Sequence, residues 1–218
     1  SANNLLDGLL GAEIRWVAAD ERDAQLQAAF EQTQAQVWKP YLMPYGGSSP
    51  LRAAAYAFAI EEMLSQECYP DWIVFATSSG GTQAGLLTGA RLFGYEGRIL
   101  GISVEEAAAD LAPRVAALAN ETMELLEGVG PIEEKDVLVN DSYLGAGYAV
   151  MGNPEREAIQ LFARHEGLLV DPVYTGRAAA GLIDLSRQGY FTPDDSVLFW
   201  HTGGTPAIFA DAYREELN

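Results

Sequence analysis

The residues best suited to chemistry in this sequence form a short cluster of hydroxyl groups and glycines at positions 78–82. The cluster consists of Ser78, Ser79, Gly80, Gly81 and Thr82. It follows an apolar run at residues 72–76 and precedes an Ala/Leu-rich helical pattern. Glycine lets the backbone approach an anion closely, and the start of a helix offers unpaired N–H groups and a positive dipole end. The cluster lacks the lysine of a nucleotide phosphate loop and the spacing of a dinucleotide-binding turn. It therefore predicts a site for a single phosphate monoester rather than for a nucleoside triphosphate with Mg²⁺.

Two other segments, Gly46–Ser49 and His201–Thr205, also combine glycines with hydroxyl groups after a predicted strand. Ligands of open parallel sheets bind at the carboxyl ends of the strands, so all three segments are expected at one edge. Each glycine pair alone is explained more simply as a turn from a strand into a helix. Three such pairs in one chain favour a ligand site.

Two tyrosines could supply acid–base chemistry at this edge. Tyr174 is expected at the end of a strand with its ring where a ligand would lie, and Tyr148 lies in a glycine-containing loop. The alternative for both is a packing role or a solvated hydroxyl. His201 is interpreted as a structural residue and His165 as the partner of a helix C-terminus. These two histidines and the single cysteine, Cys68, do not make a metal site.

Helices and strands are predicted to alternate along the chain. Helices are expected at 3–11, 20–36 (with Asp20 as its N-cap), 50–64, from Thr82, 107–127, 154–167, 177–188 and at the C-terminus. Strands are expected at 12–18, 41–50 (running into a glycine turn), 72–76, 97–104 and 196–204, and a loop at 141–150. Continuous apolar strands between amphipathic helices predict an α/β fold, with a mainly parallel sheet covered on both faces.

The composition restricts the class of protein. The chain has 218 residues, of which 49% are hydrophobic, enough to bury a sizeable core. The net charge of −18 argues against nucleic acid or an anionic membrane as a partner, and the carboxylates are interpreted as solvated surface charge. No apolar run approaches the length of about 18 residues that a membrane span needs. A single cysteine excludes an intrachain disulfide and indicates the cytoplasm.

Five motifs, taken in order, resemble those of a known family: YGGSSPLRAAAY, ATSSGGTQAGL, GAGY, LLVDPVYTGRAAAGL and VLFWHTGGTPAIF. They closely resemble the D-cysteine desulfhydrase and 1-aminocyclopropane-1-carboxylate (ACC) deaminase family. Its members are fold-type II pyridoxal 5'-phosphate (PLP) enzymes, related in architecture to the tryptophan synthase β-subunit. The similarity runs from NNLLDGLLGAEIRWV to the C-terminus. It implies a three-layer α/β architecture, PLP as the cofactor, a small amino-acid substrate and a homodimer.

The resemblance also implies roles for individual residues. The cluster at 78–82 would bind the phosphate of PLP, and Thr202 matches the hydroxyl residue that hydrogen-bonds the pyridine nitrogen. Tyr148 and Tyr174 match the two catalytic tyrosines. The deaminase branch has a glutamate directly after the second tyrosine, where this chain has Thr175. A carboxylate there would keep the ring nitrogen protonated, whereas threonine leaves it neutral, which suits elimination of thiolate better than opening a cyclopropane.

The catalytic lysine is the point of departure from the family. In the family, the lysine that forms the Schiff base with PLP lies upstream of the helix with which this chain begins, as does a Ser-Asn pair. Neither Lys39 nor Lys135 matches that lysine. We therefore expect residues 1–40 to be the remaining half of the small domain and 41–218 the large PLP-binding domain. The sheet should be incomplete at the N-terminus and expose an edge or apolar patch.

The sequence is accordingly predicted to be the C-terminal part of a PLP-dependent lyase that converts D-cysteine to pyruvate, ammonia and sulfide. It would be inactive without a separate N-terminal segment that carries the lysine. Three alternatives stay open. One is an ACC deaminase-like enzyme, and another is a non-catalytic module that binds PLP or phosphate. The third is a chain that folds and self-associates through its exposed edge without binding PLP.

Overall fold

Four parallel strands form the centre of the structure, a computed structural model that describes residues 2–36, 38–43 and 45–217. The strands are β1 (Trp72–Thr77), β2 (Arg98–Ser103), β3 (Leu138–Asn140) and β4 (Val197–Phe199). Their order in the sheet is β3-β2-β1-β4, and every neighbouring pair is parallel. In register, Trp72 of β1 lies opposite Arg98 on one side and Val197 on the other. The predicted α/β class with a parallel sheet is confirmed.

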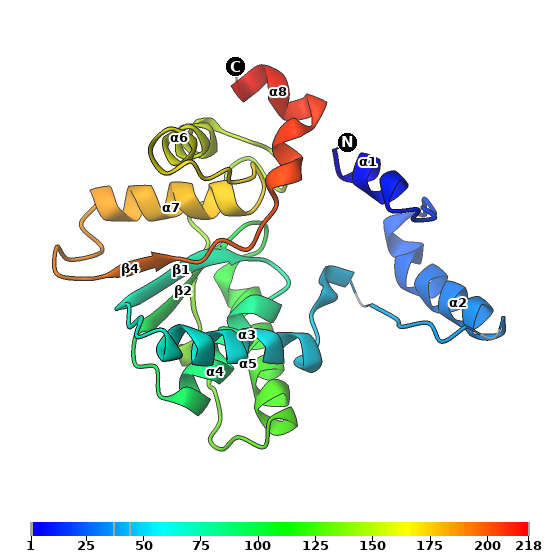
Figure 1. Cartoon of the computed structure of the whole chain (residues 1–218), viewed down its shortest axis with the longest axis horizontal. Helices are drawn as coiled ribbons and strands as arrows, with labels where there is room; N and C mark the ends of the chain where they lie inside the picture. The colour runs from blue at the N-terminus through cyan, green and yellow to red at the C-terminus, as the bar shows by residue number, and fades with distance from the viewer. Residues whose placement is uncertain (1, 37, 44, 218) are drawn as a thin grey trace.

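Helices cover both faces of this sheet (Figure 1). On one face lie α3 (Pro50–Ser65), α4 (Gly81–Phe93) and α5 (Ala108–Leu125), and on the other α6 (Asn153–Leu161) and α7 (Thr175–Arg187). Helix α6 continues into a π-helical turn, η4 (Phe162–Glu166), which ends at Gly167. The shorter elements are η2 (Tyr45–Gly47), η3 (Glu134–Asp136), η5 (Thr205–Phe209) and α8 (Asp211–Leu217). None of the helices in the described part of the chain has the length and apolar character of a membrane-spanning helix.

The central strand β1 is buried on both faces. Ile73 and Phe75 pack against α3 and α4, whereas Trp72 and Val74 pack against α7. This follows from the two-residue repeat of a strand, which sends successive side chains to opposite faces. A strand covered on both faces is apolar at every position, as the run at 72–76 is.

The sequence-based prediction holds for the elements of this central part. The strands at 72–76 and 97–104, the helices from 50 to 188 and the loop at 141–150 all form, with ends shifted by a few residues. The strand expected at 196–204 is shorter, because β4 ends at Phe199. Strand β3 was not predicted, since three residues are too few for a periodic pattern. No strand forms before Tyr174, which lies instead at the N-cap of α7.

The two strands expected near the N-terminus are wrong. Residues 12–18 and 38–43 have no regular structure, and residues 45–47 form the turn η2 rather than a strand end. The predicted segment 41–50 also includes Pro44, which lies outside the described residues. A strand is stable only when a neighbouring strand satisfies its backbone groups, and none pairs with these segments in the described part of the chain.

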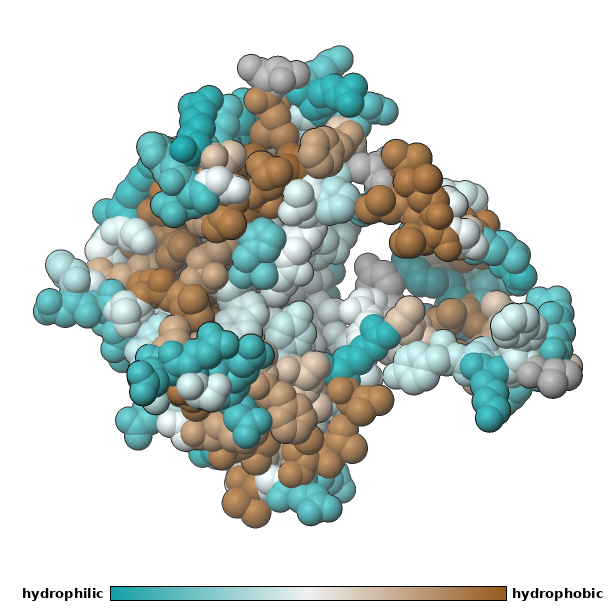
Figure 2. All heavy atoms as spheres, viewed as in Figure 1, coloured by the Kyte–Doolittle hydropathy of each residue, from teal (hydrophilic) through white to brown (hydrophobic). Residues whose placement is uncertain are grey.

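Residues 2–36 form an N-terminal arm beside the sheet-bearing part. The arm contains α1 (Ala2–Leu9), the turn η1 (Ala19–Glu21) and α2 (Arg22–Gln34). The prediction of Asp20 as a helix cap is wrong, because Asp20 lies inside η1 and Glu21 occupies the N-cap of α2 without a side-chain cap bond. Helix α1 contacts η5, whereas α2 buries none of its residues. Figure 2 shows apolar side chains on the surface of this arm. The most exposed are Leu5, Leu9, Leu10 and Trp16.

Candidate active site

The start of α4 forms a glycine-containing turn directly after β1. Strand β1 ends at Thr77, and Gly80 has a φ of 90°, a left-handed conformation that reverses the chain into the helix. Helix α4 is 13 residues long and has no side-chain cap hydrogen bond at its N-terminus. Its first turn therefore presents backbone N–H groups and a positive dipole end next to Ser78 and Ser79.

The glycine segment before α3 packs directly against this turn. The Ser48 hydroxyl donates to Ser79 Oγ at 2.8 Å and accepts from the Gly81 N–H at 3.1 Å. A Cβ on Gly81 would lie 2.7 Å from Ser48 Oγ, and one on Gly46 would lie 2.6 Å from Ser79 Cβ, so both positions require glycine. Two of the three glycine segments predicted to meet at one edge therefore do meet.

These contacts fit a phosphate group. The hydroxyls of Ser48, Ser78 and Ser79 are neutral hydrogen-bond donors that can rotate toward an anion. The Gly81 N–H donates to Ser48 Oγ, and an anion oxygen in place of that hydroxyl could accept from it. The hydroxyl of Ser49, at the N-cap of α3, is buried without a hydrogen-bond partner among the described residues. Thr82 lines a second hollow beside this turn, with Gly46, Gly47 and Ser48.

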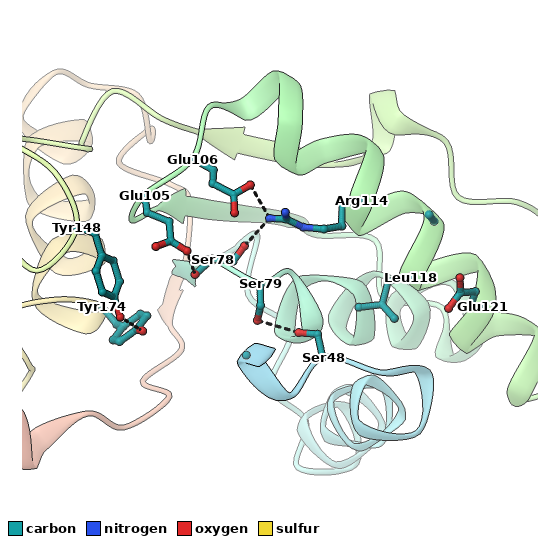
Figure 3. Close-up of a pocket in the computed structure, with 12 residues that line it drawn as sticks. Ser48, Ser78, Ser79, Glu105, Glu106, Arg114, Leu118, Glu121, Tyr148 and Tyr174 are labelled. Carbon is teal, nitrogen blue, oxygen red and sulfur yellow. Dashed lines mark hydrogen bonds and ion pairs between the residues drawn. The ribbon is translucent and has the colours of Figure 1, made fainter. Parts of the chain in front are cut away.

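A cavity of about 680 Å³ opens beside the serines. Figure 3 shows the side chains that project into it from the ends of β1 and β2, from α5 and from the loop before α6. Its lining residues are Gly46, Ser48, Ser78, Ser79, Glu105, Glu106, Arg114, Ala117, Leu118, Glu121, Tyr148 and Tyr174. Four of the predicted site residues, Ser78, Ser79, Tyr148 and Tyr174, thus share one cavity.

The two tyrosines meet through their hydroxyl groups. Tyr148 comes from the loop before α6 and Tyr174 from the N-cap of α7, and their hydroxyl oxygens are hydrogen-bonded to each other (Figure 3). Their rings stand edge to face, with centroids 6.0 Å apart and planes at 74°. Both side chains are partly open to the cavity, with 46% of Tyr148 and 37% of Tyr174 exposed. A proton can pass between two hydroxyls so placed, or from either one to a bound molecule.

Charged residues at the cavity were not predicted from the sequence. The Ser78 hydroxyl donates to Glu105 at 2.9 Å, and Arg114 donates to Glu106 at 2.7 Å and to the Ser78 carbonyl at 3.1 Å. The sequence analysis interpreted the carboxylates as scattered surface charge. Only the fold brings Arg114, which lies on α5, to the residues that follow β2.

Thr202 is not brought into the cavity. It lies exposed in the loop after β4 and is absent from the residues that line the cavity. The loop is held beside Tyr174, because the Thr175 hydroxyl lies 3.3 Å from the Gly203 carbonyl and the Gly203 N–H donates to His201 Nδ1 at 3.1 Å. The ring of His201 thus lies within the hydrogen bonds of this loop, and its structural role stays a prediction.

Both lysines of the chain lie outside the cavity lining. Lys39 is exposed in the segment that leads to η2, and Lys135 pairs with Glu133 in the exposed turn η3, at 2.5 Å.

Comparison with known proteins shows the family to which the chain belongs. Residues 1–203 match a family model described as "Pyridoxal-phosphate dependent enzyme". A solved structure of an ACC deaminase homologue is 32% identical and superposes with a TM-score of 0.87 over 99% of this chain. This chain covers 65% of that protein, just under two thirds of its length.

More distant structures share the fold alone. An L-serine ammonia-lyase from Rhizomucor miehei is 16% identical with a TM-score of 0.50, covering 76% of this chain and 56% of that one. Maize serine racemase is 14% identical with a TM-score of 0.54, covering 99% of this chain and 67% of that one. The chain belongs to the pyridoxal-phosphate dependent enzyme family, with the parallel-sheet architecture of the fold-type II members and PLP as its cofactor.

Proposed function

We propose that this chain is the cofactor-binding part of a lyase that removes the thiol from a small amino acid such as D-cysteine. With uptake of one water molecule, the products are pyruvate, ammonia and hydrogen sulfide. The main observation in support is a hydrogen bond between the Tyr148 and Tyr174 hydroxyls. It lies in the cavity that Ser78 and Ser79 also line. Elimination of a thiol needs a proton delivered to the leaving sulfur, and a pair of hydroxyls beside the cofactor's phosphate site can supply it.

In this proposal some residues of the chain bind the cofactor and others transfer a proton. When bound, PLP supplies an electron sink that stabilises negative charge on the substrate's α-carbon. The serines and backbone N–H groups at the start of α4 would hold its phosphate, and Tyr148 and Tyr174 would hold and move the proton of the leaving group. In this proposal the Thr202 hydroxyl donates a hydrogen bond to the neutral ring nitrogen.

The residue after Tyr174 favours the desulfhydrase over the deaminase. Thr175 is fully buried, and its hydroxyl bonds Asp171 Oδ1 at 2.8 Å. The position therefore offers no carboxylate to protonate the pyridine nitrogen. A neutral ring is a weaker electron sink and suits a good leaving group such as a thiol. The alternative, an ACC deaminase-like activity, is favoured by the likeness to a protein described as an ACC deaminase homologue.

We further propose that neither Lys39 nor Lys135 carries the cofactor. Lys39 and Lys135 are both exposed and away from the cavity, which supports this. In this proposal residues 1–40 belong to the small domain and 41–218 form the large domain. Apolar side chains are exposed on the N-terminal arm (Figure 2) and near the start of α3. They include Leu9, Leu10, Trp16, Trp38 and Leu51.

Amine rescue tests the proposal with the chain as it is. The chain is mixed with PLP and a small primary amine such as methylamine, which takes the place of a lysine side chain. We expect sulfide and pyruvate from D-cysteine faster than with PLP and amine alone, and no such gain from L-cysteine. Tyr148→Phe and Tyr174→Phe should each lower the rate about 100-fold or more.

Each other outcome identifies an alternative. Consumption of ACC in place of D-cysteine would favour the deaminase. A change in PLP absorbance without any turnover would favour a non-catalytic binding module, and no change at all would favour a chain that does not bind PLP. Borohydride reduction followed by peptide mass spectrometry tests the lysines separately, because labelling of Lys39 or Lys135 would refute the proposal that neither carries the cofactor.

A further inference from the structure

A fully buried arginine lies one turn after Tyr174. Arg177 is in the first turn of α7, its side chain has no exposed surface, and its guanidinium is paired with Glu155 of α6, 94% buried. Burying a charge costs several kcal/mol unless it is paired and its donors are all used. The proposed reaction does not use this guanidinium. Its position therefore needs another reason.

The guanidinium joins three separate elements. Its Nε donates to Glu155 Oε1 at 2.8 Å, and its Nη1 donates to the carbonyl of Val104, just after β2, at 2.7 Å. The second oxygen of Glu155 accepts the Gly152 N–H at 2.9 Å and so closes the start of α6. Arg177 thereby ties α7 to α6 and to the carboxyl end of β2.

The remaining donors go to the loop that carries Tyr148. Arg177 Nη1 donates to the Gly147 carbonyl at 3.2 Å and Nη2 to the Val150 carbonyl at 2.8 Å. From α8, the Tyr213 hydroxyl donates to the Ala149 carbonyl at 2.8 Å. Burial raises the pKa of Tyr213, so its hydroxyl stays protonated and able to donate. Carbonyls on both sides of Tyr148 are thus held by side chains from other elements.

The loop needs such support because its own conformation is unfavourable. Gly147 has a φ of 125°, and Ala149 has a φ of 61°, in the left-handed region that a residue with a Cβ rarely adopts. A conformation of this kind persists only where the surroundings impose it. The contacts from Arg177 and Tyr213 are those surroundings.

We propose that Arg177, with its partner Glu155 and with Tyr213, is a positioning residue that holds the loop at 145–150 so that the Tyr148 hydroxyl meets Tyr174 in the cavity. Tyr174 is at the N-cap of α7 and Arg177 is in its first turn, so the start of one helix presents one tyrosine and holds the loop of the other. The positioning follows from the contacts alone. Its catalytic consequence rests on the proposed function of the tyrosine pair.

The variant Tyr213→Phe tests the positioning with the smallest change. It removes one hydroxyl that donates to a loop carbonyl, while the ring keeps its packing against Met151, Ile159 and Val170. The matched control is Tyr95→Phe, which removes a buried hydroxyl that donates to the Pro70 carbonyl at 2.7 Å, away from the cavity lining. Amide hydrogen exchange followed by mass spectrometry reports on residues 144–151 without any cofactor.

We expect exchange in residues 144–151 to be about fivefold faster in Tyr213→Phe than in the control, the effect of one net hydrogen bond. Equal exchange in the two variants would overturn the proposal. Arg177→Lys extends the test, because an ammonium has three donors and cannot serve Glu155 and three carbonyls at once. It should loosen the same segment further. If Arg177→Lys does not fold, Tyr213→Phe decides the question.

Turnover separates this inference from the proposed function. In the amine-rescued assay, Tyr213→Phe should lower kcat for D-cysteine and leave KM and the affinity for PLP unchanged, because the serines that bind phosphate are untouched. Faster exchange with an unchanged kcat would leave the loop contacts standing and refute the role of Tyr148 in the reaction. Loss of activity with unchanged exchange would refute the positioning.

Discussion

At the phosphate site, the charged group closest to the serines is a carboxylate. Ser78 Oγ donates to Glu105 Oε1 at 2.9 Å, and both residues line the cavity. A phosphate dianion bound by Ser78 would lie close to the Glu105 carboxylate, and like charges at such separations repel by about 1 kcal/mol or more. If Ser78 binds phosphate as proposed, Glu105 should weaken that binding.

Replacing Glu105 should strengthen binding of phosphate. We expect Glu105→Gln to bind PLP and inorganic phosphate about three- to tenfold more tightly, since the repulsion is removed and an amide can still accept from Ser78. Isothermal titration with each ligand measures the change. Glu124→Gln, an equal change of charge at an exposed position of α5 outside the cavity lining, is the control. Equal affinities for the two variants would contradict the prediction.

Tyr143 links stability to alkaline pH. Burial, then the hydrogen bond to Asp184 and its charge, raises the pKa of Tyr143 to about 12. The folded state holds this proton more tightly than the unfolded chain, where the pKa is near 10. The stabilisation is therefore fully present below about pH 10 and is lost as the pH rises toward 12. Urea unfolding at about pH 9 and pH 11 should show a smaller fall in the free energy of unfolding for Tyr143→Phe than for the unaltered protein. An equal fall in both would refute this assignment.

At the scale of elements, the approach of α3 to α4 depends on small residues. A Cβ on Gly89 of α4 would lie 2.6 Å from the Ala57 carbonyl oxygen of α3 and 2.9 Å from Ile60 Cβ. Backbone atoms cannot yield as a flexible side chain can. The two helices must therefore separate to admit even one methyl group, and the contacts of α3 and α4 with β1 would separate with them.

We expect Gly89→Ala to lower the free energy of unfolding by about 1–3 kcal/mol, although alanine favours a helix more than glycine does. Gly8→Ala in α1 is the matched control, because a Cβ there has no heavy atom within 4 Å. It should leave the stability unchanged or slightly raised. Urea denaturation measures both variants. A stable Gly89→Ala would show that α3 and α4 can move apart at little cost.

The elements predictable from sequence are those whose signal is local. The run at 72–76 is apolar at every position because both faces of β1 are covered, and Pro50 and Gly81 mark helix starts. The strand expected at 12–18 does not form, because a strand is stable only beside a neighbouring strand, which can lie far away in the sequence. Its alternating pattern is present in the sequence, yet Trp16 is 81% exposed.

In the candidate site too, only the residues with a local sequence signal were predicted. The segment 78–82 and the tyrosines were found from residue type and order, and the structure brings Ser78, Ser79 and both tyrosines to one cavity. The Arg177–Glu155 pair was missed, since 22 residues separate the two and nothing local marks either as buried. The sequence therefore predicts the candidate site residues more readily than the residues that hold them in place.

At the scale of the whole molecule, the excess negative charge destabilises the folded state. The chain has 31 acidic and 13 basic residues, and most of its ion pairs are exposed, such as Arg15–Glu13 and Arg187–Glu157. Exposed pairs contribute little, about 0–1 kcal/mol each. The excess negative charge repels itself in the compact state more than in the expanded unfolded chain. Salt should therefore weaken the repulsion between like charges more than it weakens the attraction within the ion pairs.

Added salt is accordingly expected to stabilise this protein. Raising NaCl from about 0.02 M to about 0.3 M shortens the screening length from more than 20 Å to about 6 Å, which is less than the separation of most surface charges. The urea midpoint at neutral pH should rise over this range. The double variant Glu61→Lys/Glu124→Lys, changed at two exposed positions, has a smaller net charge and should show a weaker rise. A midpoint that falls with salt would mean that the ion pairs outweigh the repulsion.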